Sequence, residues 1–174
     1  MVTTRAARRE DADVLGGIHV ATWRSAYAGL VPQALLDGLS AQDSAARWRG
    51  LLPCSPPQVC LVAVDAVDRP TGFAFAGPHR DAADPDTAEL YSLYVHPARA
   101  GTGVGTALLE RTCDHLRAAG FTRARLWVLT TNDHAKAFYG RRGWIADGRT
   151  RVETRDGVEL HESGLTCDLV PPPP

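Results

Sequence analysis

The chain has 174 residues and a formal net charge of −1 at pH 7, from 19 basic and 20 acidic side chains. This length predicts one domain with a full hydrophobic core, and the near-neutral charge argues against nucleic acid or an anionic membrane as a partner. No apolar run approaches the roughly 20 residues of a membrane helix, and residues 1–10 lack the apolar centre of a signal peptide, so we expect a cytoplasmic protein.

The basic side chains are almost all arginine, since Lys136 is the only lysine. We interpret this bias as the mark of a GC-rich bacterial genome rather than of a phosphate-binding surface. The four cysteines form no C-x-x-C pair and the six histidines show no metal spacing. We therefore predict free thiols in a reducing compartment and no metal site.

Hydrophobic periodicity and turn residues divide the first half of the chain. The predicted elements are a strand over 1–8, a helix over 9–30, one or two short helices over 32–50, and strands over 58–65, 71–78 and 89–96. Asp11 or Asp13 can cap the first helix, and Pro97 ends the third of the later strands. These three strands are expected to be antiparallel, with a polar loop at 79–88.

The second half of the chain continues with a helix over 104–119, ended by Gly120. A strand over 122–131, a helix over 132–143 and a hairpin over 144–170 follow, with Asp156-Gly157 as a type I′ turn signal. The fold class is therefore mixed α/β (α+β), too rich in hairpins for a doubly wound sheet. We expect residues 1–170 to form a single domain, with prolines 171–174 as a disordered tail.

The stretch HPARAGTGVG, from His96 to Gly105, links a predicted strand to a predicted helix. Free amides at a helix N-terminus and the helix dipole together favour an anion, and glycine allows close approach of a pyrophosphate. A nucleotide P-loop is rejected because Thr106-Ala107 follows in place of Lys-Ser/Thr. The dinucleotide motif fits poorly because the third glycine comes one residue early. A tight turn without a ligand stays open at this point.

Two segments together resemble a known family. ELYSLYVHPARAGTGVGTALLE resembles the acetyl-CoA signature of the GNAT superfamily of N-acetyltransferases, and LTTNDHAKAFYGRRGW resembles its second signature. The resemblance implies a three-layer fold with a mostly antiparallel mixed sheet that splays at the cofactor site. It also implies acetyl-CoA as co-substrate, with the pyrophosphate on the loop amides and the pantetheine arm along the strand that ends at Val95. The family usually has Arg or Gln where this chain has Ala100, one residue after Arg99.

The resemblance assigns cofactor contacts to three segments: the end of the strand, the loop, and the second signature. These residues are Leu93, Tyr94, Val95, Arg99, Ala100, Gly101, Thr102, Gly103, Val104, Gly105, Thr106, Asn132, Phe138 and Tyr139. The Val95 amide is the first candidate to stabilise the thioester oxygen. For Asn132, a plain helix cap is an equal alternative.

Two residues are candidates for proton transfer. The resemblance makes Tyr139 the acid for the departing thiolate, although its helix face also suits the core. It makes Glu89 the base that neutralises the amine, directly or through water, with an ordinary surface carboxylate as the alternative. Strand alternation predicts two faces: Glu89, Tyr91, Leu93 and Val95 on one, and Leu90, Ser92, Tyr94 and His96 on the other.

The acceptor is expected against the first helix, with Trp23 and Tyr27 on one helix face, beside Glu89 and Tyr91. Core packing explains the pair Trp23 and Tyr27 equally well, and His19 can add aromatic surface. The C-terminal hairpin, with Glu153, Glu159, His161 and Glu162, is the candidate for the opposite wall.

The predicted function is an N-acetyltransferase that acts on a primary amine by direct attack in a ternary complex. Small amines, amino-acid-like compounds, aminoglycoside-type antibiotics and peptide N-termini all fit as acceptors. The family often forms homodimers, so a homodimer is compatible with the sequence. The alternative function is a non-catalytic module of the same fold that binds coenzyme A.

Overall fold

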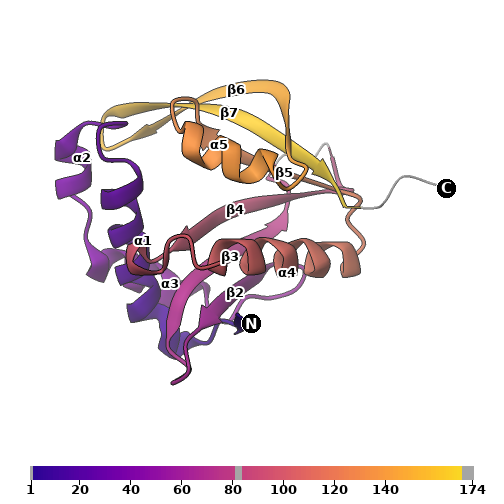
Figure 1. The fold of residues 1–174 in the computed structure, drawn as a ribbon, viewed down its shortest axis with the longest axis horizontal. Coiled ribbons are helices and arrows are strands. Elements are labelled where there is room, and N and C mark those ends of the chain that lie inside the picture. The colour runs from indigo at the N-terminus through magenta and orange to yellow at the C-terminus, as the bar shows by residue number, and fades with distance from the viewer. Residues whose placement is uncertain (1, 81–83, 170–174) are drawn as a thin grey trace.

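The computed structural model describes residues 2–80 and 84–169, which form one mixed sheet with helices on both faces (Figure 1). Its strands are β1 (Thr3–Ala6), β2 (Val59–Val64), β3 (Pro70–Pro78), β4 (Thr87–Val95), β5 (Arg123–Leu129), β6 (Ile145–Arg155) and β7 (Val158–Asp168). Its helices are η1 (Arg9–Asp11), α1 (Ala12–Ala26), α2 (Gln33–Asp37), α3 (Ala41–Leu51), η2 (Pro97–Arg99), α4 (Val104–Ala118) and α5 (Asp133–Gly140). The predicted proline tail lies outside the described residues.

The sheet has seven strands in the order β1-β2-β3-β4-β5-β7-β6. All neighbours are antiparallel except β4 and β5, which are parallel. The parallel pair arises because α4 carries the chain from one end of the sheet to the other, as a crossover must. The mixed α/β class predicted from the hairpin signals is confirmed, and so is the mostly antiparallel sheet that the resemblance implies.

Helices α4 and α5 lie on one face of the sheet and α1 and α3 on the other (Figure 1). The α4 side buries the larger apolar cluster, which includes Leu108 and Leu116 of α4 and Leu126 of β5. On the other side, Leu15 and Ile18 of α1 pack with neighbouring strands. Burial of these apolar stripes holds the three layers together. Within the described residues, every helix is too short or too polar to cross a membrane.

Strands β4 and β5 diverge shortly after they begin. Their pairing covers only Thr87–Glu89 against Arg123–Arg125, although β4 continues to Val95 and β5 to Leu129. Each strand stays paired on its other side, β4 with β3 and β5 with β7, so the backbone on both sides of the opening remains ordered. This is the splay expected at the cofactor site.

A β-bulge at Tyr91 reverses the side-chain alternation of β4. Phe75 of β3 pairs with Ser92 and the next residue, Ala76, pairs with Leu90, so Tyr91 is an extra residue without a partner on β3. Before the bulge, Ala88 and Leu90 lie in the cluster under α4; after it, Leu93 and Val95 pack against that same cluster. The predicted common face of Glu89, Leu93 and Val95 is therefore wrong.

Glu89 instead lies on the face of the sheet that α1 and α3 cover. Its ion-pair partner Arg80 lies over the ring of Tyr91, and that ring contacts Phe75, which packs against the α1 side of the core. Tyr94 packs on this side as well. The strand thus turns Glu89 and Tyr94 toward one face and its two later apolar side chains toward the other.

Some element ends differ from the sequence prediction. Helix α1 ends at Ala26, four residues before the predicted end, and Gly29 follows with φ +76°. Asp11 precedes α1 without a side-chain cap, because its carboxylate accepts hydrogen bonds from Arg5 and from the Arg8 amide. The predicted type I′ turn is confirmed, since Asp156 and Gly157 have φ values of 49° and 77°.

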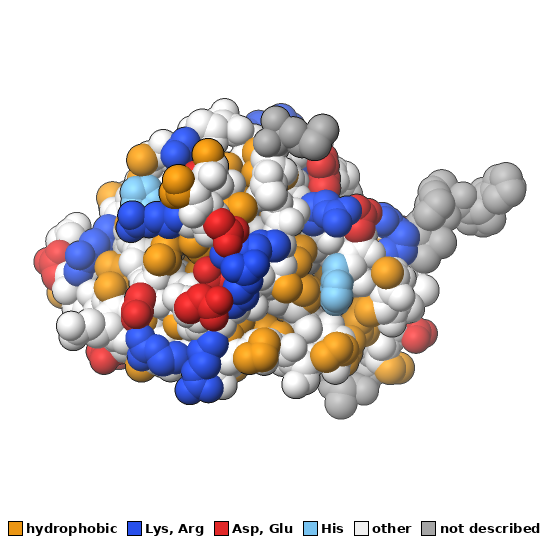
Figure 2. Space-filling view, turned by 90° about the horizontal axis from the view of Figure 1, so that it is seen from below, with side chains coloured by type: hydrophobic (Ala, Val, Ile, Leu, Met, Phe, Trp, Pro, Cys, Tyr) orange, Lys and Arg blue, Asp and Glu red, His pale blue; other side chains and the backbone are white. Residues whose placement is uncertain are grey.

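One face of the molecule carries both signs of charge in close mixture. On the face shown in Figure 2, basic and acidic side chains are interspersed, and hydrophobic side chains form small patches between them. This distribution agrees with the net charge of −1. It is unlike the continuous basic surface of a nucleic-acid-binding domain.

Candidate active site

The glycine loop leaves the first amides of α4 without side-chain caps. Gly101 and Gly103 have φ values of +74° and +86°, a region that costs other residues free energy. Gly103 is the N-cap residue of α4 and has no side chain to offer. The first-turn amides of an α-helix have no acceptor within the helix, so those of Val104, Gly105 and Thr106 are available to an anion.

Gly105 fits the loop for a different reason. A Cβ atom there would lie 3.4 Å from two ring carbons of Phe138 and 3.5 Å from Cγ2 of Val95. The start of α4 is therefore pressed against α5 on one side and the end of β4 on another. This contact brings the loop, the splayed strand and the second signature to one place.

Changing Gly103 to Ala should lower both stability and cofactor affinity. The new Cβ meets no atom within 4 Å, so the expected cost is conformational, about 1 kcal/mol, and the loop amides would shift. Gly17→Ala is the matched control, because that residue lies inside α1 in open space and alanine is favoured there by up to about 1 kcal/mol. Thermal unfolding with and without coenzyme A measures both effects. An equal ligand-induced rise in Tm for both variants would contradict the assigned role of the loop.

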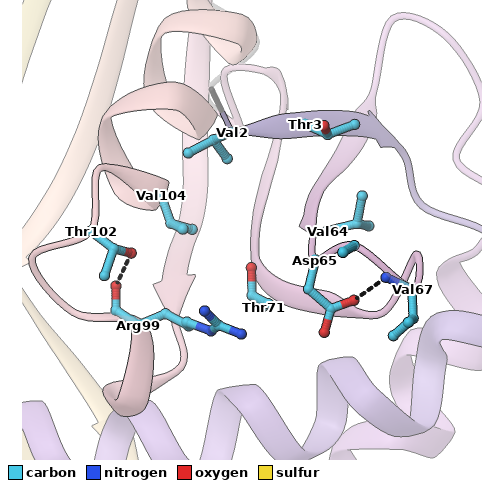
Figure 3. A pocket seen from close by; sticks show the side chains of 10 residues that line it. Val2, Thr3, Val64, Asp65, Val67, Thr71, Arg99, Thr102 and Val104 are labelled. Carbon is cyan, nitrogen blue, oxygen red and sulfur yellow. Dashed lines mark hydrogen bonds between the residues drawn. The ribbon is translucent and has the colours of Figure 1, made fainter.

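Arg99 points away from α5. Its side chain extends toward Thr71 in a pocket of about 720 Å³ between the loop and the β2–β3 turn, while its carbonyl accepts a 2.7 Å hydrogen bond from the Thr102 hydroxyl (Figure 3). The lining of this pocket comes from β1, β2, β3 and the loop, and includes no residue of β5 or α5. Phe138 is thus not among the residues that line the pocket around Arg99.

The end of β4 directs backbone amides into the opening between β4 and β5. The His96 amide donates to the Thr71 carbonyl of β3 over 2.9 Å. Because successive residues of an antiparallel strand point their N–H groups to alternate sides, the Val95 amide points away from β3, and the Leu93 amide does the same. The Val95 carbonyl on that side accepts a 2.9 Å hydrogen bond from the Thr22 hydroxyl of α1.

The ring of Tyr139 on α5 is half-buried against the apolar cluster under α4. Its ring packs edge-on against Phe138, with centroids 5.1 Å apart, and against Trp144 at 5.8 Å. Burial raises its pKa well above the usual value, with further increases from Tyr94 and Cys113. Among the described residues, its hydroxyl makes no hydrogen bond. Tyr139 therefore keeps its proton, and its ring packs on Phe138, the side chain nearest to Gly105.

Tyr94 and Tyr27 bring two more phenols toward Tyr139. Burial raises the pKa of Tyr27, and the phenols of Tyr94 and Tyr139 raise it further. The Tyr94 hydroxyl accepts a 3.0 Å hydrogen bond from the Trp23 indole. The Trp23 and Tyr27 rings meet edge to face, 4.6 Å between centroids. Trp23 and Tyr27 were predicted to share a helix face; the structure places both in one aromatic cluster with Tyr94.

His19 supports the aromatic cluster from within α1. Its ring stacks on Tyr94 at 5.1 Å and accepts or donates a 2.7 Å hydrogen bond with the Ser44 hydroxyl. Burial lowers the pKa of His19 to about 4, with smaller contributions from the charges of Arg155 and Arg47. It is therefore a neutral packing residue near pH 7. Glu89 and Tyr139 therefore remain the two candidates for proton transfer.

Glu89 is fully buried and paired with Arg80. Its side chain is 2% exposed against 58% for Arg80, and it accepts hydrogen bonds from the Arg80 amide at 3.3 Å and from Nε at 3.1 Å. Burial raises its pKa, but the hydrogen bonds and charge of Arg80 outweigh this effect and the pKa is lowered overall. The surface-carboxylate alternative is thus wrong for Glu89, because this carboxylate lies inside the protein.

The hairpin β6–β7 contributes charges to the same side of the sheet. Glu162 pairs with Arg151 over 2.6 Å, and burial raises its pKa against the effect of that pairing. Glu153 pairs with Arg151 at 3.2 Å. The charge of Glu153 raises the pKa of Arg80, and the charges of Glu153 and Glu162 both raise the pKa of Tyr94. Glu159 and His161, also predicted for this wall, are exposed and 3.9 Å apart.

Asn132 caps α5, as one of its two predicted roles required. Its Oδ1 accepts a 3.0 Å hydrogen bond from the Ala135 amide. Among the described residues its Nδ2 makes no hydrogen bond, so this donor stays available to a ligand.

The four cysteines are free thiols. Within residues 2–80 and 84–169, no group of His, Cys, Asp and Glu side chains is arranged to hold a metal ion.

Sequence reasoning did not identify Arg80, Thr22 or Arg142 as site residues. Arg80 lies in the predicted polar loop, and its pairing with Glu89 depends on the turn of the chain at the end of β3. Thr22 reaches Val95 across 73 positions. Arg142 contacts Thr106 across 36 positions. Such long-range contacts leave no local periodic signal.

The free amides at the start of α4 and the end of β4 adjoin α5, which carries the half-buried phenol of Tyr139, and β4 itself carries the paired carboxylate of Glu89. This arrangement can bind an acyl donor that carries phosphates and can stabilise the negative charge that acyl transfer develops, which defines an acyltransferase. The chain belongs to the acetyltransferase (GNAT) family, whose model matches residues 23–144. The predicted family, fold and enzyme class are thereby confirmed.

Known proteins are similar to this chain over nearly its whole length. The uncharacterized N-acetyltransferase YuaI of Bacillus subtilis is 31% identical over 95% of this chain and 92% of its own. The crystal structure of a GCN5-related N-acetyltransferase from Rhodopseudomonas palustris is 26% identical, with a TM-score of 0.74 over 97% of this chain and 96% of that one. An acetyltransferase from Salmonella typhimurium, solved with acetyl-CoA, shares the fold at 20% identity and a TM-score of 0.73, over 98% and 95% of the two chains.

Proposed function

We propose that the protein transfers an acetyl group from acetyl-CoA to a primary amine of a small molecule or peptide, by direct attack in a ternary complex. The observation that carries this proposal is the opening between β4 and β5, together with the Val95 amide and the Tyr139 hydroxyl, which make no hydrogen bond within residues 2–80 and 84–169. Family membership and the acetyl-CoA bound by the Salmonella relative support the donor.

The residues around the opening fit coenzyme A. The amides of Gly103, Val104, Gly105 and Thr106 would hold its diphosphate, because they combine the helix dipole with uncapped donors. The free edge of β4 would bind the amide groups of its pantetheine arm by strand-like hydrogen bonds. Phe138 and the free Nδ2 of Asn132 flank this path. The bound molecule would supply the acetyl group as a thioester.

Two groups are placed to assist bond rearrangement. The Val95 amide would donate to the thioester oxygen as negative charge develops there, an effect that needs a fixed donor. Tyr139 would give its proton to the departing thiolate. Its raised pKa keeps that proton in place throughout the physiological pH range.

The acceptor would enter from the α1 side of the sheet, where the aromatic cluster of Trp23, Tyr27 and Tyr94 faces the opening. Tyr91 and Glu89 lie on the same side. A free alkylammonium has a pKa near 10 and must lose a proton before it attacks. Glu89 would receive that proton through water, because its carboxylate is buried behind Arg80.

A coupled assay tests the proposal: release of coenzyme A from acetyl-CoA across a panel of amines, amino acids, aminoglycosides and peptides. Turnover with at least one class of amine is expected, and varying both substrates should give intersecting initial-velocity lines. Parallel lines would indicate a covalent acetyl-enzyme instead. Binding of acetyl-CoA without transfer to any amine in the panel would contradict the proposed function.

A further inference from the structure

Arg142 lies beside the uncapped start of α4, although it follows α5 in the chain. Its Nη2 donates a hydrogen bond to the Thr106 hydroxyl in the first turn of α4. Its Nη1 donates to the Phe138 carbonyl over 2.7 Å. The guanidinium carbon lies 3.9 Å from the centroid of the Phe138 ring, the ring that touches Gly105. Three contacts therefore fix a cation at the end of the glycine loop.

No carboxylate neutralises this cation within the described part of the chain. Arg142 takes part in none of the ion pairs there, and its buried Nε has no hydrogen-bond partner. A guanidinium has five N–H donors, and the two hydrogen bonds of Arg142 leave the other donors unused. Removing a charged donor from water without a partner is costly, so this arrangement favours an anionic ligand that completes the set.

The other arginine of the loop does not meet this need. Arg99 extends toward Thr71 in a pocket that no residue of α5 lines (Figure 3), whereas Arg142, which follows α5, contacts Thr106 at the start of α4. Ala100 brings no charge. Of these two arginines, Arg142 is thus the one that adjoins both the first-turn amides of α4 and Phe138.

We infer that Arg142 is a cofactor-binding residue and that its guanidinium holds the diphosphate of coenzyme A together with the amides of the glycine loop. The inference rests on the proposed use of acetyl-CoA. The Thr106 hydroxyl accepts from Arg142 and keeps its own proton to donate to the same anion. The stacked Phe138 ring holds the guanidinium plane in one orientation, which favours paired contacts to phosphoryl oxygens.

The test compares Arg142→Met with wild type by calorimetry, using three ligands. Coenzyme A carries the diphosphate and a 3′-phosphate, dephospho-coenzyme A carries only the diphosphate, and S-acetylpantetheine carries neither. The variant should bind the first two about 10- to 100-fold more weakly, the range for a lost charge-assisted hydrogen bond. Binding of S-acetylpantetheine should be unchanged. Arg142→Lys should recover only part of the loss, because lysine lacks the planar fork.

Arg141→Ala is the matched control, because Arg141 is the adjacent arginine and is exposed. This substitution should change the affinity for coenzyme A less than about 2-fold. At saturating acetyl-CoA, kcat of Arg142→Met should stay near that of wild type while KM for acetyl-CoA rises. If the variant bound only coenzyme A more weakly, Arg142 would contact the 3′-phosphate instead of the diphosphate, and the assignment would be overturned. An equal loss for all three ligands, or no loss, would overturn it as well.

These outcomes separate the inference from the proposed function. If wild type binds coenzyme A but acetylates no amine, the function fails while the affinity comparison still decides the role of Arg142. If the variant binds all three ligands as wild type does, the role of Arg142 fails and the acetyl transfer proposal is unaffected.

Discussion

Tyr139→Phe is expected to lower kcat by about 10²- to 10⁴-fold, the usual contribution of a positioned general acid, and to leave the affinity for acetyl-CoA unchanged. The substitution removes one oxygen from a ring that packs against Phe138 and Trp144. Since no hydrogen bond from that hydroxyl is present within the described residues, folding stability should change little. Steady-state kinetics and calorimetry measure the two effects separately.

The pH dependence of kcat gives a second readout for Tyr139. Burial raises the pKa of this phenol, so the acid form should persist and kcat should show no fall below about pH 10, the ordinary pKa of a tyrosine. Tyr91→Phe is the comparison for loss of a phenol hydroxyl, because that hydroxyl donates to the Pro78 carbonyl. Since Tyr91 lies on the proposed acceptor side, its kcat is compared at saturating acceptor, and only Tyr139→Phe should show the large fall. Equal kcat in Tyr139→Phe and wild type would remove Tyr139 from the mechanism.

Glu89→Gln is expected to lower kcat/KM by about 10²-fold at pH 7, at the lower end of the range for a general base. The deficit should shrink as the pH approaches 10, where the free amine loses its proton without help. Glu159→Gln is the control, since that carboxylate is 70% exposed. A deficit that stays constant up to pH 10 would show that Glu89 does not act by proton removal.

Arg80→Met should shift the acidic limb of kcat/KM to higher pH. In wild type, burial raises the pKa of Glu89, but the hydrogen bonds and charge of Arg80 lower it by more, so the net pKa lies below the ordinary value. Without the guanidinium only the burial effect remains, so the carboxylate should take up a proton at a higher pH than in wild type. An acidic limb that does not move in this variant would place the base elsewhere.

The same pair connects stability with pH. A carboxylate whose pKa is lowered on folding stabilises the protein above its unfolded pKa, and this contribution is lost as the pH falls through the folded value. In Arg80→Met the pKa of Glu89 should lie above its unfolded value instead of below it. The free energy of unfolding should then fall as the pH rises. At neutral pH we expect a loss of about 1–3 kcal/mol, the cost of a buried group without its partner, measured by urea unfolding at pH 4 and pH 7.

Local signals in the sequence were sufficient for most of the fold. Strand alternation, the glycines at Gly120 and Gly143, and the Asp156-Gly157 turn all act over a few residues, and the structure has the elements in the predicted order. The family resemblance supplied the splay between β4 and β5, which neither strand shows in its own pattern. Pairing of strands distant in sequence depends on the whole sheet, so periodicity cannot reveal where it stops.

The candidate site was less accessible to such reasoning. Simple alternation placed Glu89 beside Val95, because a sequence does not show that Tyr91 is an extra residue opposite β3. The neutralising partner Arg80 belongs to a segment with no regular pattern. Arg142 has the spacing of an ordinary helix-face residue, and only the packing of α5 against α4 reveals its contact with Thr106.

The bulge at Tyr91 has a consequence for how this enzyme can diversify. Because one added residue reverses the orientation of everything after it, Leu93 and Val95 contact the α4 side while Tyr94 contacts α1. Deleting that residue would exchange these environments in a single step and put a phenol into the apolar layer. Changes in substrate preference should therefore accumulate by replacement of side chains on α1 and the hairpin β6–β7, while the length of β4 stays fixed.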